Sequence, residues 1–157
     1  MSVVCSGNIC RSPIGEKVLQ AAFADAGLGS RVEVSSAGTG NWHVGQGAND
    51  TAVAVLTAAG YPTEHTARQI AAGELEELDL VLAADRGHVE ELRRLLGDPD
   101  GHDQNKVVLL RSFDPDAADD EIPDPYYGPR AGFEDVLAMT RSAAPHIVAA
   151  VRERLDG

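Results

Sequence analysis

Residues 4–13 read VCSGNICRSP, and this stretch decides the fold. It follows directly from a short apolar strand, VVC at residues 3–5, and it ends where a helix is expected to begin. Ser12 is a favourable N-cap, and Pro13 suits the first helical position. Apolar residues then recur at helical spacing from residue 14 to residue 26. The stretch is therefore predicted to be the loop of a strand–loop–helix unit.

Strands and helices are predicted to alternate along the whole chain. Strands are expected at 3–5, 32–35, 79–83 and 106–110, helices at about 12–26, 52–59, 89–96 and 131–155, a glycine-rich loop at 37–47, and a loop rich in proline and aspartate at about 112–130. Pro145 lies inside the last helix, where it is expected to kink or split it. Alternating strands and helices imply a parallel sheet, because each parallel connection needs a crossover. The absence of a repeat or linker predicts one α/β domain, 1–157.

Composition and charge restrict the function. The 157 residues are 43% hydrophobic and 24% charged, as expected of a globular protein that buries a core. The net charge of −12 argues against a nucleic-acid binder, which needs a basic face. Neither a transmembrane run nor a signal peptide is recognisable, so a cytoplasmic protein without membrane contact is expected. Two cysteines five positions apart form neither a disulfide framework nor a zinc site.

The loop after the first strand has the composition of an anion cradle. Gly7 permits a positive φ, and Asn8 is among the residues that tolerate it best. The start of the following helix adds unpaired amides and the positive end of a helix dipole. Arg11 supplies a planar guanidinium that matches two phosphate oxygens. Because the same groups stabilise a thiolate, Cys5 is predicted to be a nucleophile that attacks a bound phosphate ester.

Attack on a phosphate ester also requires a proton donor for the departing oxygen. Residues 122–129 read IPDPYYGP, and in them Asp124 lies between two prolines that stiffen the loop. Asp124 is therefore the candidate acid. On spacing alone, a turn aspartate is an equally good interpretation.

Taken together, VCSGNICRSP and DPYYG resemble the low-molecular-weight protein tyrosine phosphatases. The segments SAGTGNWHVG (36–45) and HTARQI (65–70), and Asp85 after DLVLAA, follow in that family's order, so the resemblance covers essentially the whole chain. It implies a three-layer fold in which helices flank a four-stranded parallel sheet, with a phosphate-binding loop after the first strand. It also implies that neither a metal nor an organic cofactor is needed.

The resemblance assigns roles to individual positions. Cys5 would form a phosphocysteine, Arg11 would bind the phosphate, and Asp124 would act first as general acid and then as general base. The implied phosphate-binding loop is Cys5, Ser6, Gly7, Asn8, Ile9, Cys10, Arg11 and Ser12; the supporting network is Asn8, Ser12, Ser36 and His65; the walls of the substrate cleft are Ile9, Trp42, Tyr126 and Tyr127. Judged alone, His65 would be an ordinary loop histidine and Trp42 a core residue.

The implied substrate is phosphotyrosine, because a deep cleft excludes the shorter phosphoserine. The expected partners are phosphotyrosine proteins, with an autophosphorylating tyrosine kinase among the candidates, and the expected state is a monomer. For Cys10 the residues alone suggest space filling. The family implies a redox partner that forms a reversible disulfide with Cys5 and protects it from irreversible oxidation.

Four alternatives compete with this interpretation. Non-enzymatic phosphotyrosine binding would need Cys5 or Asp124 to be missing, and both are present. An arsenate reductase of this fold needs a further cysteine pair, and no cysteine follows Cys10. A phosphocarrier domain should lack Arg11 and Asp124. A protein-arginine phosphatase of the same family would carry threonine at the position of Ile9, so Ile9 favours tyrosine. One departure is Gly15, where the family usually has alanine, and glycine there is expected to cost about 0.5–1 kcal/mol of helix stability.

Overall fold

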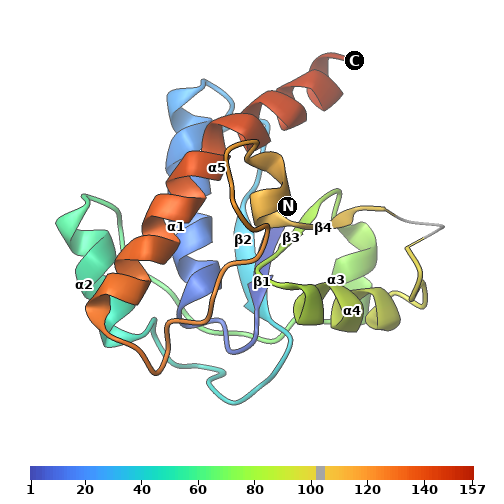
Figure 1. The fold of residues 1–157 in the computed structure, drawn as a ribbon. Helices are drawn as coiled ribbons and strands as arrows, with labels where there is room; N and C mark the ends of the chain where they lie inside the picture. Colours follow the sequence, from blue (N-terminus) through green and yellow to red (C-terminus); the bar gives the residue numbers. More distant parts are fainter. Residues whose placement is uncertain (102–104) are drawn as a thin grey trace.

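The computed structural model describes residues 1–101 and 105–157 (Figure 1). Its elements, in chain order, are β1 (Ser2–Cys5), α1 (Arg11–Asp25), β2 (Ser35–Gly38), α2 (Asp50–Ala58), α3 (Ala72–Glu77), β3 (Val81–Ala83), α4 (Arg86–Leu95), β4 (Val107–Leu109), a short 3₁₀ helix η1 (Leu110–Phe113) and α5 (Arg130–Asp156). No helix in this described part of the chain combines the length and apolar character needed to cross a membrane.

The sheet has four parallel strands in the order β2-β1-β3-β4. Val3 pairs with Leu82 and Val4 with Ala83, and successive side chains point to opposite faces. Val3 and Leu82 join a large apolar cluster beneath α1, α2 and α5, whereas Val4 and Ala83 join a smaller one beneath α3 and α4. The predicted three-layer α/β fold is confirmed.

The second strand differs from its prediction. It occupies Ser35–Gly38 rather than 32–35, so the valine-rich segment precedes the strand instead of forming it. Val34 is nevertheless buried in the larger cluster. The small residues Ser35–Gly38, and not the valine-rich segment, pair with β1, because this strand lies close to the loop that follows β1.

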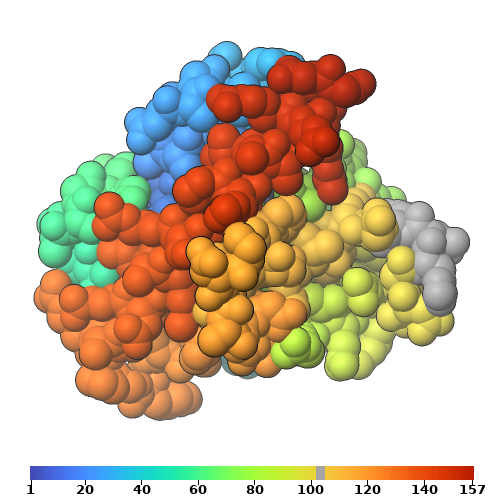
Figure 2. Space-filling model, turned by 45° about the horizontal axis from the view of Figure 1, so that its top comes forward, coloured from blue at the N-terminus to red at the C-terminus, as the bar shows by residue number. Residues whose placement is uncertain are grey.

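Helix boundaries also shift for physical reasons. Helix α1 begins at Arg11 with Cys10 at its N-cap, so Ser12 is not the predicted N-cap but lies in the first turn. Its hydroxyl contacts the Cys5 sulfur in the preceding loop. The short helix α3 was not predicted, because six residues carry too little periodicity. Helix α5 continues through Pro145 as one helix (Figure 1), and in Figure 2 the C-terminal residues, drawn orange to red, cross the face of the molecule.

Gly15 has a packing role that its helical position does not reveal. A Cβ built on Gly15 would lie 2.9 Å from Cγ1 of Val3, which is buried in the central strand. Glycine therefore permits the close approach of α1 to β1. Its cost to helix propensity is offset by contact with the sheet.

Candidate active site

The loop between β1 and α1 is held against the end of β2 by backbone contacts. Thr39 donates its amide to the Cys5 carbonyl at 2.9 Å, and Gly40 donates to the Ser6 carbonyl at 3.0 Å. A Cβ on Gly38 would lie 2.6 Å from that Ser6 oxygen, so only glycine allows this approach. Loop and strand therefore form one rigid unit at the carboxyl edge of the sheet.

Asn8 is the centre of the loop. It has a φ of 59°, and it is the one non-glycine residue with positive φ among those described. Its Nδ2 donates to Oγ of Ser12 at 2.8 Å and to Oγ of Ser36 at 3.0 Å, while its Oδ1 accepts from the Arg68 amide at 3.0 Å. Nε2 of His65 lies 2.6 Å from the Asn8 carbonyl oxygen and is the donor. The structure thus brings the whole predicted network together around one buried residue, Asn8.

Cys5 lies at the end of β1, with its Sγ 3.0 Å from Oγ of Ser12. Ser12 already accepts from Asn8, which leaves its own proton for the sulfur. The backbone amides of residues 7–10 donate to no other group in the described residues, so they remain available to an anion. Together with the start of α1, these donors favour negative charge at this point.

Arg11 is almost fully buried, with 4% of its surface exposed, and one of its nitrogens is fixed. Its Nη1 donates to Oδ2 of Asp85 and to the Ile122 carbonyl, both at 2.9 Å. Its Nη2 lies 3.9 Å from Oδ2 of Asp124, and within the described chain neither Nη2 nor Nε makes a hydrogen bond. One edge of the guanidinium is therefore anchored, and the other is free to bind two anion oxygens.

Asp124 is placed by the loop that precedes α5. The Ile122 amide donates to the Ala84 carbonyl at 2.8 Å, which fastens this loop to the end of β3. Oδ1 of Asp124 accepts a hydrogen bond from the Tyr126 amide at 3.1 Å. This bond orients the carboxylate so that Oδ2 faces Arg11. The carboxylate is therefore directed at the same space as the cysteine loop.

The partly exposed Asp85 and the buried His88 form a pair beside Arg11. Burial raises the pKa of Asp85, but the facing His88 ring and the Arg11 hydrogen bond outweigh burial and leave the pKa below its ordinary value. Burial lowers the pKa of His88 despite the nearby Asp85 carboxylate. The ring is therefore neutral at neutral pH, where Arg11 is the cation that Asp85 faces.

These parts surround a cleft of about 310 Å³. It is lined by Cys5, Ser6, Gly7, Ile9, Cys10, Arg11, Trp42, His43, Asp124, Tyr126 and Tyr127. Trp42 and Tyr127 are 68% and 94% exposed, so they form the rim rather than the floor. The Tyr126 ring stacks edge-on against Tyr127 at 4.7 Å and lies 6.1 Å from His43. The mouth of the cleft is thus aromatic, and its floor is the cysteine loop.

Cys10 is buried and lines the same cleft as Cys5. Burial, followed by the negative charges of Cys5 and Asp124, raises the pKa of the Cys10 thiol to about 12, against a lowering by Arg11. At neutral pH Cys10 is therefore a protonated thiol, unlike a nucleophile or a metal ligand.

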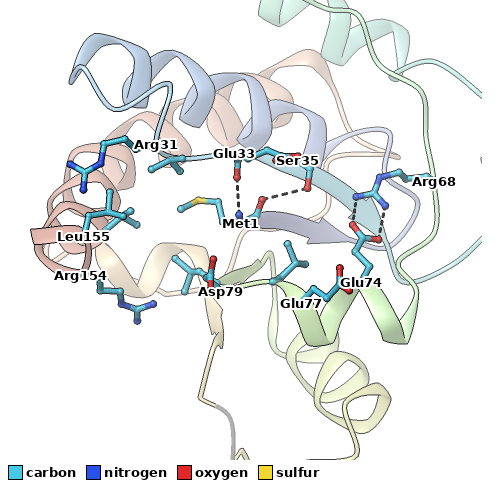
Figure 3. A pocket seen from close by; sticks show the side chains of 14 residues that line it. Met1, Arg31, Glu33, Ser35, Arg68, Glu74, Glu77, Asp79, Arg154 and Leu155 are labelled. Atoms are coloured by element: carbon cyan, nitrogen blue, oxygen red, sulfur yellow. Dashed lines mark hydrogen bonds and ion pairs between the residues drawn. The ribbon is translucent and has the colours of Figure 1, made fainter. Parts of the chain in front are cut away.

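A larger cavity, of about 820 Å³, lies at the opposite edge of the sheet (Figure 3). The ammonium group of Met1 donates there to the Glu33 carbonyl at 2.7 Å, and Arg68 pairs with Glu74 at 2.5 Å. None of the loop residues lines it. Of these two cavities, only the smaller cleft combines a cysteine thiol, an arginine and a carboxylate in its lining.

Several residues of the site were given no role by the sequence analysis. Gly38 and His43 lie in the segment SAGTGNWHVG (36–45), but their residue types alone do not indicate a function. Arg68 contributes through its backbone amide, which no side-chain pattern reports. Asp85 is recognisable only by its place after a strand, and His88 only by its spacing of three from that aspartate.

A cysteine–arginine loop at the carboxyl end of the first strand of a parallel sheet is the arrangement expected of a cysteine-dependent phosphatase. Comparison with known families agrees: the model described as "Low molecular weight phosphotyrosine protein phosphatase" matches residues 1–156. The chain belongs to this family. The predicted enzyme class, a phosphoric monoester hydrolase of the protein-tyrosine-phosphatase type, is thereby confirmed.

Individual relatives cover nearly the full chain. A low molecular weight protein-tyrosine-phosphatase of Streptomyces coelicolor is 52% identical over 98% of this chain and 94% of its own length. The low molecular weight protein-tyrosine phosphatase A of Mycobacterium tuberculosis is 46% identical over 99% and 93%. Among solved structures, a protein tyrosine phosphatase of Entamoeba histolytica superimposes with a TM-score of 0.90 at 29% identity, covering 97% of this chain and 96% of its own. YfkJ of Bacillus subtilis gives a TM-score of 0.89 at 28% identity, covering 98% and 94%.

Proposed function

We propose that this protein hydrolyses phosphotyrosine in proteins through a phosphocysteine on Cys5. The Cys5 thiolate attacks phosphorus, and the bond from phosphorus to the tyrosine oxygen breaks while Asp124 donates a proton to that oxygen. Asp124, now a carboxylate, then takes a proton from water as the water oxygen attacks phosphorus. The sulfur–phosphorus bond breaks, which releases phosphate and restores the thiolate. One observation carries this proposal: Cys5, Arg11 and Asp124 line a single cleft.

The geometry supports a role for each of the three groups. The hydroxyl of Ser12, at 3.0 Å, supplies a hydrogen bond to the Cys5 sulfur both as nucleophile and as leaving group. Arg11 presents a free edge next to loop amides that have no other partner among residues 1–101 and 105–157. Preorganised donors of this kind stabilise the charge that develops on the transferred phosphoryl group.

The cleft also supports tyrosine over other phosphorylated side chains. Its floor is reached through an aromatic rim formed by Trp42, Tyr126 and Tyr127, which suits the faces of a substrate ring. Ile9 places an aliphatic side chain on the lining, where a hydroxyl would suit the more polar phosphoarginine. Phosphotyrosine peptides should therefore be hydrolysed faster than phosphoarginine peptides, and faster release from arginine would assign the protein to the alternative activity.

Two variants with a matched control test the mechanism. Cys5→Ser should abolish aryl phosphate hydrolysis and the phosphoenzyme that acid quenching traps in the wild type. Asp124→Asn should lower kcat by about 10²–10⁴ for a poor leaving group. Asp116→Asn changes another exposed aspartate of the same loop, outside the cleft, and should leave turnover intact. A Cys5→Ser protein that still hydrolyses the ester would refute the mechanism.

The same thiol pair supports a redox role. Hydrogen peroxide would oxidise Cys5 to a sulfenic acid, and Cys10 would then attack that sulfur, forming a disulfide and releasing water. Oxidation removes the Cys5 charge that helps to raise the pKa of Cys10, so Cys10 becomes a better nucleophile at the step that needs it. Mass spectrometry of peroxide-treated protein should find a Cys5–Cys10 link, and a sulfinic acid in its place would contradict this role.

For the cellular setting we expect a cytoplasmic monomer that acts on phosphotyrosine proteins, an autophosphorylating tyrosine kinase among them. Cys5→Ser protein used as a substrate trap in lysate tests this expectation. Recovery of phosphotyrosine proteins that vanadate displaces would support it. Equal recovery with vanadate present would contradict it.

A further inference from the structure

His88 is a buried side chain of α4 that contacts two separate parts of the phosphate site. It is 3% exposed, and its Nε2 lies 2.8 Å from Oγ of Ser6, the residue that follows the nucleophile. On its other side it completes the cap of α4 with Asp85, whose carboxylate holds Arg11 at 2.9 Å. One imidazole therefore spans from the cysteine loop to the anchor of the arginine.

Both ring nitrogens have a polar neighbour. Nδ1 lies 3.3 Å from the Asp85 amide, which donates, and 3.1 Å from Oδ1 of Asp85, which accepts from the backbone amide of His88 at the same distance. Nε2 shares a hydrogen bond with Oγ of Ser6, and because a hydroxyl can donate or accept, this bond forms in either ring tautomer. The neutral ring agrees with a pKa that burial lowers.

We propose that His88 is a positioning residue for the phosphatase reaction, acting through Ser6 on the cysteine loop and through Asp85 on Arg11. The inference rests on the proposed function, because it assumes that loop and arginine bind the same phosphoryl group. Ser6 is otherwise tethered through its carbonyl, which accepts from Gly40 at 3.0 Å. The bond to His88 adds a tether from the opposite side, so the loop is fixed between β2 and α4.

Helix capping alone would not require a histidine. An asparagine side chain can accept a hydrogen bond from the Asp85 amide in the same way, but it is too short to reach Ser6 as well. The second ring nitrogen is what connects the cap to the loop. Correct spacing of loop amides and guanidinium matters most in the transition state, where both must meet the same equatorial oxygens.

A double-mutant cycle separates this role from a structural one. Ser6→Ala and His88→Asn should each lower kcat for an aryl phosphate about tenfold with little change in KM, and the double variant should lose no more than either alone. Ser6→Thr keeps the hydroxyl and should lose less activity than Ser6→Ala. Glu90→Ala, on the exposed face of α4, is the control and should match the wild type.

Vanadate, which adopts the five-coordinate geometry of the transition state, gives a readout without turnover. The single tryptophan, Trp42, lies on the rim of the cleft and reports binding by its fluorescence. Vanadate affinity should fall about tenfold in both single variants, whereas affinity for inorganic phosphate should change less than twofold.

Each outcome distinguishes the two proposals. An active wild type with fully active Ser6→Ala, or losses that multiply to about a hundredfold in the double variant, would overturn the positioning role alone. A loss in His88→Asn without one in Ser6→Ala would mean that His88 only caps α4, which also overturns it. A wild type that neither hydrolyses the ester nor binds vanadate would refute the proposed function, and this inference with it.

Discussion

Replacing Asn8 with alanine should be among the most damaging single changes outside the catalytic groups. The change deletes hydrogen bonds to Ser12, Ser36 and the Arg68 amide, while the carbonyl contact with His65 survives. At a net value of about 1 kcal/mol each, the three lost bonds contribute about 3 kcal/mol. Alanine at a φ of 59° adds about 1–2 kcal/mol of backbone strain. The free energy of unfolding should therefore fall by about 4–5 kcal/mol.

The two contributions to the Asn8 effect can be measured separately. Asn8→Gly loses the same side-chain bonds without the strain, so it should be more stable than Asn8→Ala by about 1 kcal/mol after the greater freedom of unfolded glycine is included. For a chain of this size, about 4 kcal/mol corresponds to a fall in Tm of about 8–16 °C. Urea and thermal unfolding of the three proteins, with kcat measured in parallel, provide the assay.

A matched control for Asn8 exists in the same chain. Asn49 caps α2 through an Oδ1 that accepts from two amides, and Asn49→Ala should cost about 1 kcal/mol. Its own amide still donates to the Ile9 carbonyl, so turnover should survive. The reasoning is refuted if Asn8→Ala lowers Tm no further than Asn49→Ala, or if Asn8→Gly is the less stable of the two Asn8 variants.

Three further predictions concern close approach and thiol reactivity. Gly38→Ala would place a Cβ 2.6 Å from a loop carbonyl oxygen, so kcat should fall more than tenfold in steady-state assays, and an unchanged kcat would contradict the close packing of loop and strand. Gly15→Ala should lower Tm rather than raise it, because the new Cβ meets Cγ1 of Val3 at 2.9 Å; an increase in Tm would show that helix propensity dominates there. Iodoacetamide at pH 7.5 should alkylate Cys5 before Cys10, since the pKa of the Cys10 thiol is raised to about 12 and its thiolate is scarce; peptide mapping that finds Cys10 modified first would contradict this.

The cysteine loop was predictable because its chemistry is local. Its strand, its glycine and asparagine, and the helix that follows are adjacent in sequence, and the structure places them as expected. The position of β2 was not predictable, because Val32 and Val34 have higher strand propensity than the Ser35–Gly38 segment that pairs with β1. Close contact with the loop requires the smaller residues, and that contact is tertiary.

Two other failures have the same origin. Ser12 has the residue type of an N-cap, but its hydroxyl contacts the Cys5 sulfur in the loop instead of capping the helix. His88 meets Ser6 across a separation of 82 residues, so no window of sequence contains both partners. Residue types thus indicate which groups can react, whereas the supporting contacts depend on how distant segments meet.

The anchoring of the loop has a consequence for the order of folding. Asn8 is held by segments 28 to 60 residues further along the chain, and Arg11 by a carbonyl 111 residues away. Contacts of such high sequence separation form late, because long chain segments must first be ordered. During synthesis Cys5 is made more than a hundred residues before Ile122, yet the pocket around that cysteine cannot close before Ile122 has been made and folded. The cysteine loop is thus synthesised before the segments that hold it, and it is among the last parts of the fold to take shape.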